Sequence, residues 1–230
     1  MLRAIIFDFD GVIVDTERFH FQALQRVLEE EQIPLTWDEY TQTYLAMDDK
    51  NCFRAILSRH KRAVTPPKIE ELTERKAVFF FNDADSVALF PGVTRFIHNA
   101  VQKHPLAIAS GALREEIEFF LAKVGLREYF PVVVAAQDVE KGKPDPEAYV
   151  TALARLNRLG SGKPVSPSEC LVIEDSRHGV AAARAAGMRC LAVTNSYALE
   201  ELTAAHAVVK SLEELDLIQL EALFPSPDHC

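Results

Sequence analysis

The feature that most restricts how this chain can fold is a short apolar run near its start that ends abruptly in acidic residues. Residues 2–7 are mainly apolar, and Asp8-Phe9-Asp10-Gly11 follows directly. Such a run predicts a strand buried on both faces, which is typical of a parallel sheet. Residues two apart in a strand point the same way, so Asp8 and Asp10 could converge on one point, while Gly11 lets the backbone turn away. Because ligands bind outside the carboxyl ends of parallel strands, these acids mark a candidate active site.

Two other interpretations of this stretch fit less well. A solvated acidic turn would not carry Phe9 and the apolar Val12-Ile13-Val14. A calcium-binding loop would need a third oxygen ligand before the glycine, polar residues after it and a helix in front. Here an apolar strand is predicted in front of the acids, so the spacing argues against calcium.

The length and composition of the chain are those of a globular protein that can bury a sizeable core. Its 230 residues are 48% hydrophobic, which fits one large domain or a core domain with an insertion. The formal net charge of -9 argues against nucleic acid or an anionic membrane as a partner. A small phosphorylated metabolite remains a possible ligand, because local basic residues can still bind a small anion.

The cysteines and the N-terminus favour a cytoplasmic protein. The four cysteines show neither the close pairs of a zinc site nor the density of a disulfide framework, so we expect reduced thiols. No basic and apolar signal precedes the first strand, and no apolar run approaches the roughly 20 residues that span a bilayer. We expect a monomer or weak dimer.

The hydrophobic periodicity divides the chain into a helical block and an alternating part. Apolar residues at helical spacing predict helices over residues 16–33, 37–45, 50–59 and 67–81, and no alternating strand is found before Pro91. Beyond Pro91, strands are predicted at residues 106–109, 132–136, 170–173, 189–193 and 207–209. Helices are predicted at residues 93–103, 113–124, 146–159 and 180–186, with a last helix after the final strand.

This order of elements predicts an α/β fold. Alternating strands and helices imply a Rossmann-like parallel sheet with helices on both faces, and the apolar first strand must pair within it. Residues 1–15 and 86–230 would form this core domain, and residues 16–85 would be an inserted all-helical cap. Residues 225–230, at the end of the chain, are expected to be frayed.

Further polar residues follow other predicted strands. Ser110-Gly111 and Glu174-Asp175-Ser176 each end a strand, and Lys141 and Lys143 lie in the loop after residues 132–136. Taken alone, Ser110-Gly111 could be an ordinary turn and the lysines could be solvated. In a parallel sheet, however, all of these strand ends meet at one edge. Four carboxylates in one cleft need a cation, and hard oxygen ligands favour Mg²⁺. A phosphate could be held there by Ser110, by backbone amides and by a lysine, which predicts phosphoryl transfer.

These segments, in this order, resemble the haloacid dehalogenase-like hydrolase superfamily and, within it, the β-phosphoglucomutase-like phosphatases. Residues 8–17, Ser110-Gly111, residues 143–146 and Glu174-Asp175-Ser176 resemble its four motifs, with a cap inserted between the first two. The resemblance covers essentially the whole chain. It implies that Asp8 is a nucleophile that forms an aspartyl-phosphate and that Asp10 is the general acid and then the general base.

The resemblance also implies how the remaining site residues act. Mg²⁺ would be bound by Asp8, the backbone carbonyl of Asp10, Asp175 and Glu174. The transferring phosphoryl group would be held by Ser110, the amide of Gly111 and Lys143. In the cap, the candidate substrate or hinge residues are Thr16, His20, Lys50 and Lys76, and Arg114 is a further candidate; the alternative for His20 and Lys76 is ordinary solvation.

One departure from the family pattern decides between two activities. The related mutases carry a lysine-glycine pair after a leucine in the cap, whereas Leu45 is followed here by Ala46-Met47, with Lys50 a few residues later. Arg114 stands near where a mutase has an asparagine. We therefore predict a phosphatase acting on a sugar phosphate, with a sugar phosphomutase as the alternative. A non-enzymatic phosphoacceptor or a silent sugar-phosphate-binding module fits less well, because the acids are intact and a receiver domain needs no helical insertion.

Overall fold

The computed structural model describes residues 1–45, 47–83, 88–215, 220–221 and 223–224. Part of the expected hinge near residues 86–91, most of the expected last helix, the expected frayed end and Cys230 lie outside this part of the chain. Contacts divide the chain into two compact units. We call Met1–Val14 with Leu89–Cys230 the core unit, and Asp15–Ala88 the helical unit.

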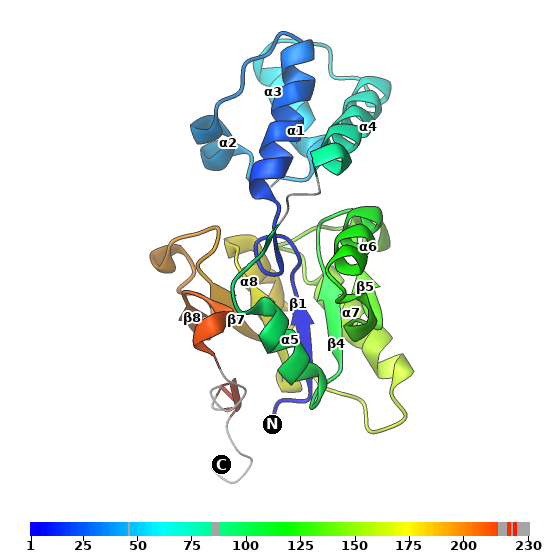
Figure 1. Ribbon diagram of the computed structural model, residues 1–230, viewed down its shortest axis with the longest axis vertical. Helices are drawn as coiled ribbons and strands as arrows, with labels where there is room; N and C mark the ends of the chain where they lie inside the picture. Colours follow the sequence, from blue (N-terminus) through cyan, green and yellow to red (C-terminus); the bar gives the residue numbers. More distant parts are fainter. Residues whose placement is uncertain (46, 84–87, 216–219, 222, 225–230) are drawn as a thin grey trace. The chain divides into compact units, whose positions relative to one another are not determined.

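The core unit contains a six-stranded sheet in which every neighbouring pair is parallel. Its strands follow the order β5-β4-β1-β6-β7-β8, which places β1 between β4 and β6. Figure 1 shows β4 beside β1. The strands are β1 (Ala4–Phe7), β4 (Leu106–Ala109), β5 (Val132–Val134), β6 (Cys170–Glu174), β7 (Arg189–Val193) and β8 (Ala207–Val209). The predicted parallel sheet is confirmed, with its first strand in the interior.

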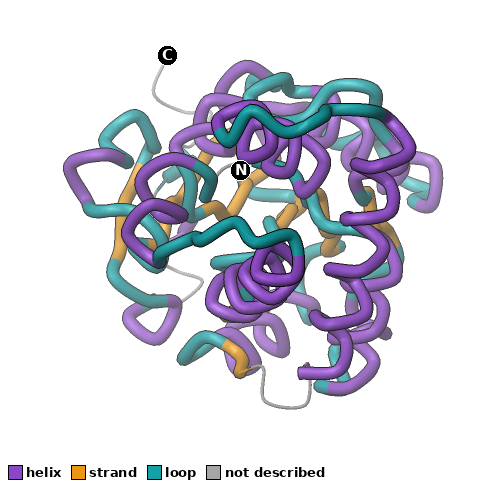
Figure 2. The backbone as a smooth tube through the Cα atoms, turned by 90° about the horizontal axis from the view of Figure 1, so that it is seen from above, coloured by secondary structure: helices purple, strands orange, loops and turns teal. Residues whose placement is uncertain are grey.

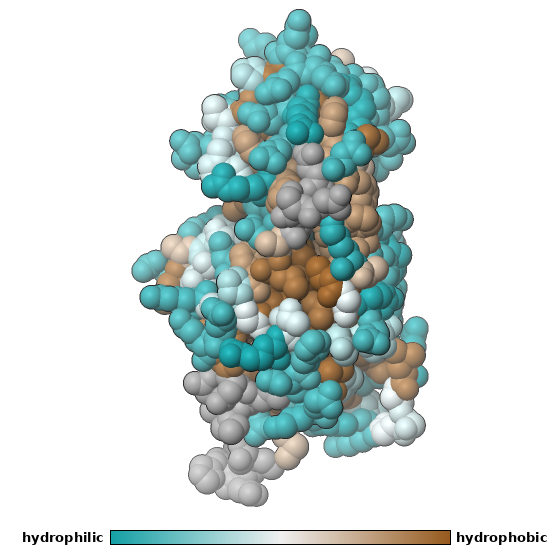
Figure 3. Space-filling model, viewed as in Figure 1, coloured by the Kyte–Doolittle hydropathy of each residue, from teal (hydrophilic) through white to brown (hydrophobic). Residues whose placement is uncertain are grey.

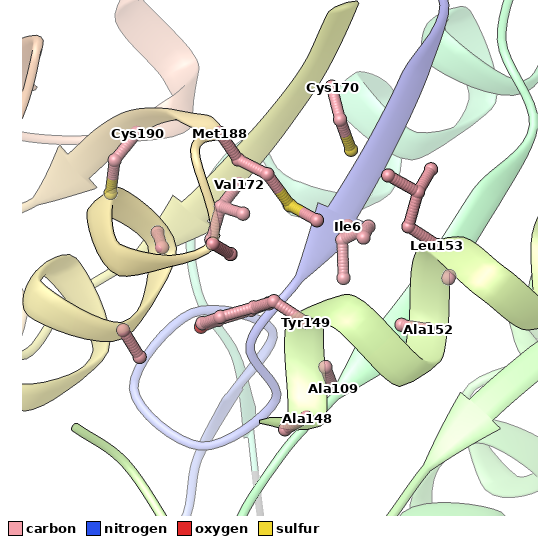
Figure 4. Close-up of a cluster of buried hydrophobic side chains, with 14 of the residues drawn as sticks. Ile6, Ala109, Ala148, Tyr149, Ala152, Leu153, Cys170, Val172, Met188 and Cys190 are labelled. Carbon is pink, nitrogen blue, oxygen red and sulfur yellow. The ribbon is translucent and has the colours of Figure 1, made fainter. Parts of the chain in front are cut away.

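Helices cover both faces of this sheet, as predicted. They are α5 (Val93–Val101), α6 (Arg114–Lys123), α7 (Glu147–Leu159) and α8 (Arg177–Ala185), joined by the short 3-10 helices η2 (Arg127–Tyr129), η3 (Ala136–Asp138), η4 (Pro167–Glu169), η5 (Leu199–Glu201) and η6 (Leu212–Glu214). On one face, Ile6 of β1 packs with Tyr149 and Leu153 of α7 (Figure 4). On the other face, the ring of Phe7 packs edge-on against Phe96 of α5, with the ring centroids 6.0 Å apart.

The helical unit has a core of its own. Its helices are α1 (Glu17–Glu30), α2 (Trp37–Thr43), α3 (Asp49–Arg59) and α4 (Pro66–Asp83), and they appear with the other helices as purple tube in Figure 2. Leu24 and Leu28 of α1 are buried with Phe53 and Ile56 of α3. These residues recur at spacings of three or four, which is the pattern that predicted the helices.

The structure adds one pair of short strands and moves one helix start. Two-residue strands, β2 (Val14–Asp15) and β3 (Ala88–Leu89), pair with each other before Pro91, and strands this short leave no alternation to detect. Helix α8 begins at Arg177 rather than at residue 180, because the Ser176 hydroxyl accepts a hydrogen bond from the Gly179 amide and caps the helix.

The described cysteines lie in the interior, and the surface seen in Figure 3 is largely polar. The face shown in Figure 3 is mainly hydrophilic, with hydrophobic atoms gathered on the core unit near α5. Cys52, Cys170 and Cys190 are free and buried. Within the described residues, no helix has the length and apolar character needed to cross a membrane.

Candidate active site

Three buried carboxyl groups meet at the carboxyl ends of two adjacent strands. Asp8 follows β1, Glu174 ends β6 and Asp175 comes next; the Asp8 amide donates to the carbonyl of Ile173, at 2.9 Å, so the strands stay in register to their ends. One oxygen from each of the three carboxyl groups lies within 4.8 Å of the others. We call these residues the acidic triad. Their convergence follows from the pairing of β1 with β6.

Lys143 supplies a positive charge inside the triad. Its Nζ lies 2.9 Å from Oδ1 of Asp8 and 2.6 Å from Oε1 of Glu174. The charges of Asp8 and Glu174 outweigh the effect of burial and raise the pKa of Lys143, so the ammonium stays charged at neutral pH. Lys141, in the same loop, is 71% exposed and lies outside this cluster.

Glu174 is held by a set of hydrogen-bond donors. The hydroxyl of Tyr149 donates to its Oε1 at 2.6 Å, and the amides of Asp175 and Ser176 and the Ser176 hydroxyl donate to its Oε2 at 2.9–3.0 Å. Burial alone would raise the pKa of Glu174, but Lys143 and these donors outweigh it and lower the pKa. Glu174 is therefore a fixed anion at neutral pH.

The other two members of the triad are poorly neutralised. Burial raises the pKa of Asp8 to about 7, against the opposing charge of Lys143 and with a further increase from Glu174. Burial, Glu174 and Asp8 raise the pKa of Asp175 well above its ordinary value, although the Ser196 hydroxyl donates to it. With all three carboxyl groups ionised, the ammonium of Lys143 would balance only one of their charges, and the raised pKa values of Asp8 and Asp175 reflect this imbalance. A divalent ion with a preference for oxygen ligands fits this donor set.

Two glycines allow the backbone to approach the triad closely. Gly11 has φ +77°, and a Cβ there would lie 1.9 Å from Oδ2 of Asp175. A Cβ on Gly179, in the first turn of α8, would lie 1.6 Å from Oε1 of Glu174. Neither position can hold a side chain without displacing a carboxylate of the triad.

The candidate phosphate-binding residues lie at the end of the next strand. Ser110 follows β4, is buried, and its amide donates to the carbonyl of Val134. Gly111 has no heavy atom within 4 Å of the position where a Cβ would be. Because β4 and β6 flank β1, Ser110 and the triad belong to the ends of three neighbouring strands.

Asp10 is half-buried, lies outside the triad, and its charge contributes to the raised pKa of Asp8.

The candidate residues of the helical unit are placed differently from what sequence patterns indicate. Lys76 is 1% exposed, and its Nζ contacts Oδ1 of Asp49 at 2.5 Å and Nδ1 of His20 at 2.7 Å. Thr16 is buried just before α1. Lys50 is 46% exposed and pairs with Glu70 at 2.7 Å. Lys76 is thus a buried, neutralised cation within this unit.

Arg114 belongs to another part of the core unit. Its guanidinium binds the carboxylate of Asp138 and donates to the carbonyl of Val133 at 3.2 Å. Within the described residues it has no ion pair with the triad.

Sequence reasoning missed several side chains that position the triad. Tyr149 and Ser176 hold Glu174, and Ser196 holds Asp175. The side-chain amide of Asn195 donates through Nδ2 to the carbonyl of Gly11 at 2.7 Å. Of these residues, the sequence indicated only Ser176 as part of the site, because it directly follows Glu174 and Asp175. Tyr149 lies at a helical core position, and nothing in the local pattern distinguishes it from a packing residue.

Fold and site together define an α/β enzyme with buried carboxylates at the ends of adjacent parallel strands. The chain belongs to the haloacid dehalogenase-like hydrolase family, whose model matches residues 5–193. A phosphorylated carbohydrates phosphatase of Thermotoga maritima is 33% identical over 190 residues, covering 81% of this chain and 82% of that protein. The beta-phosphoglucomutase of Bacillus subtilis is 27% identical over 221 residues, covering 94% of this chain and 92% of that protein. The structure of CbbY from Rhodobacter sphaeroides in complex with phosphate aligns with a TM-score of 0.84 at 29% identity, covering 96% of this chain and 100% of that one.

Proposed function

We propose that this protein is a Mg²⁺-dependent phosphatase that hydrolyses a small phosphorylated metabolite, a sugar phosphate, through an aspartyl-phosphate on Asp8. The observation that carries the proposal is the contact of one buried lysine with Asp8 and Glu174, beside the third acid Asp175. This arrangement provides one ammonium for three buried carboxyl groups, so full ionisation of the site calls for a further cation. The phosphatase and mutase relatives support the same reaction class.

In the proposed reaction, Asp8 and Asp10 divide the work. A carboxylate oxygen of Asp8 attacks phosphorus, the bond from phosphorus to the leaving oxygen breaks, and Asp10 gives that oxygen its proton. Asp10 then takes a proton from water, the water oxygen attacks phosphorus, and the bond from phosphorus to Asp8 breaks. Phosphate leaves and Asp8 is regenerated.

The other residues would bind and orient the phosphoryl group. Ser110, the Gly111 amide and Lys143 would contact its oxygens. The triad and the backbone carbonyl of Asp10 would hold Mg²⁺, which would offset the charge on the phosphoryl oxygens.

We also propose that residues 16–85 form a cap that selects the substrate. The protein would act in the cytoplasm as a monomer or weak dimer.

Hydrolysis of p-nitrophenyl phosphate tests the proposed reaction. We expect release of phosphate that depends on Mg²⁺, is abolished by EDTA, and falls by about 10³-fold or more in Asp8→Asn, which cannot form the acyl phosphate. Asp38→Asn, which changes an exposed acid of α2, is the matched control and keeps full activity. Substantial turnover in Asp8→Asn would rule out the covalent route.

A sugar phosphomutase is the second candidate, supported by the beta-phosphoglucomutase relative. A mutase must also hold a second phosphate. Two lysines that are candidate substrate or hinge residues of the cap are already paired, Lys76 with Asp49 and Lys50 with Glu70, which favours simple hydrolysis. Product analysis with glucose 1-phosphate separates the two activities: free phosphate and glucose indicate a phosphatase, and glucose 6-phosphate stimulated by a bisphosphate indicates a mutase.

A further inference from the structure

A second charged site lies on the core unit, along the edge strand β5. A pocket of about 340 Å³ there is lined by Arg114 of α6, Arg127 of η2, and Arg155 and Arg158 of α7, together with apolar residues of β5. We call these four arginines and the pocket between them the arginine pocket. Its volume falls within the range of small-ligand sites.

The arginine pocket carries an excess of positive charge in a strongly acidic chain. Asp138 pairs with Arg114 and with Arg155, and Glu118 lies against Arg114 and Arg127. Four guanidinium groups against two carboxylates leave two positive charges, while the whole chain has a formal net charge of -9. Such a local reversal of sign favours a dianion.

Three of the guanidinium groups are already held in place. Nη atoms of Arg114 and Arg155 each donate to the carbonyl of Val133 at 3.2 Å, and Nη1 of Arg127 donates to the carbonyl of Phe130 at 2.7 Å. Binding an anion would therefore require little further ordering of these side chains. Arg158 is exposed and has no hydrogen bond or ion pair among the residues that the structure describes. It can turn toward a ligand without breaking a hydrogen bond or an ion pair.

The same contacts argue against a peptide adding to the sheet edge. A new strand would need the backbone groups on the open side of β5, and the Val133 carbonyl already accepts from two guanidinium groups. The site is a single pocket rather than a long basic stripe, and this opposes nucleic acid. Guanidinium groups match the oxygens of a phosphate with paired hydrogen bonds.

We propose that the arginine pocket binds the dianionic phosphate group of a small molecule, at a site separate from the acidic triad. Within the described residues, none of its four arginines has an ion pair with Asp8, Glu174 or Asp175. The ligand is inorganic phosphate or a phosphorylated metabolite, which share this chemistry. The proposal does not depend on the proposed catalytic function.

Amide chemical shifts measured by NMR can test the site directly in the full chain. Asp8→Asn in EDTA prevents turnover, and inorganic phosphate and glucose 6-phosphate are titrated in separate arms. We expect shifts at the amides of Val132, Val133 and Leu159, apart from any shifts at Ser110 and Gly111 that report the other phosphate site. The arm with the tighter dissociation constant identifies the kind of ligand.

Matched substitutions in the same background show whether the arginines are responsible. Arg158→Gln and Arg127→Gln should each weaken binding at the β5 amides by about tenfold, the loss of one charge-assisted hydrogen bond. Arg54→Gln, an equal change of charge in the helical unit, should leave it unchanged. Because Arg158 is exposed and makes no hydrogen bond or ion pair among the described residues, we expect Arg158→Gln to fold normally, and its thermal unfolding temperature, measured beside that of Arg54→Gln, checks this. The proposal would be overturned if the chemical shifts of the β5 amides did not change up to about 10 mM ligand. It would also be overturned if Arg158→Gln and Arg54→Gln changed the dissociation constant equally.

Discussion

Asp8 combines a proposed catalytic role with an unfavourable environment. Burial raises its pKa to about 7, far above the value of 3.8 that it has in an unfolded chain. A carboxyl group with a raised pKa stabilises the folded state at pH values below the unfolded pKa, and this contribution is lost as the pH rises through about 7. Without a metal ion, the ionised form of Asp8 is therefore a source of instability at neutral and higher pH.

Asp8→Asn should accordingly stabilise the metal-free protein in a pH-dependent way. In EDTA at pH 8 we expect the variant to exceed the wild type by on the order of 1 kcal/mol or more in free energy of unfolding, since it cannot carry the buried charge. At pH 5, where Asp8 of the folded protein binds a proton, the gain should be clearly smaller than at pH 8, and it should disappear only below the unfolded pKa of 3.8. Mg²⁺ should reduce the gain at pH 8. Thermal unfolding monitored by circular dichroism measures this. An equal gain at both pH values would contradict the assignment, and Asp38→Asn gives the baseline for an exposed acid.

At the scale of single residues, the sequence indicates reactive groups better than it indicates their supports. Asp8, Glu174 and Asp175 stand out because acids directly after buried strands need an explanation. Tyr149 and Ser196 do not stand out, since they lie 25 and 21 positions from the acids they contact. Lys76 appears in the sequence as one lysine on an amphipathic helix, and only packing reveals that it is buried.

Among the elements, α8 has the closest geometric link to the proposed metal site. Its first turn places Gly179 against Glu174, and the Ser176 hydroxyl both caps the helix and donates to Glu174. The position of the helix therefore fixes the position of the carboxylate. A side chain at Gly179 would have to move one of them.

Gly179→Ala should disturb both stability and metal binding. The added methyl group would lie 1.6 Å from Oε1 of Glu174, so we expect a loss of about 1–3 kcal/mol in free energy of unfolding, as in other overpacked cores. We also expect Mg²⁺ to bind more weakly, as measured by isothermal titration calorimetry. Gly142→Ala is the control, because no atom lies within 4 Å of the position of its Cβ. Unchanged Mg²⁺ affinity in Gly179→Ala would contradict the role given to Glu174.

Periodicity predicted the long elements and missed the short ones. The buried positions of α1 and α7 repeat every three or four residues, which is a strong signal. The predicted strand at residues 132–136 ends at Val134, because η3 follows at once and its residue Asp138 accepts a hydrogen bond from the Ala135 amide. The pair β2 and β3 comes from two segments that are distant in sequence, which no local pattern can indicate.

For the whole molecule, the decisive prediction was that the first strand lies inside the sheet. Its apolar residues require burial on both faces, and β1 indeed lies between β4 and β6. That position brings Asp8, Ser110 and Glu174 to neighbouring strand ends although more than 160 residues separate the first from the last. The arginine pocket was not predicted, since its members come from α6, η2 and α7 and carry no shared motif.

The central claim, that Asp8 becomes phosphorylated, is best tested by trapping the intermediate in Asp10→Asn. The good leaving group of p-nitrophenyl phosphate needs little help from a general acid, so phosphorylation should proceed, whereas hydrolysis of the intermediate should be slow without the base. After acid quenching in the presence of Mg²⁺, peptide mass spectrometry should find one phosphoryl group on Asp8, formed in step with a burst of p-nitrophenol. Continued release of phosphate with no phosphoryl group on Asp8, or a phosphoryl group on another residue, would contradict the account.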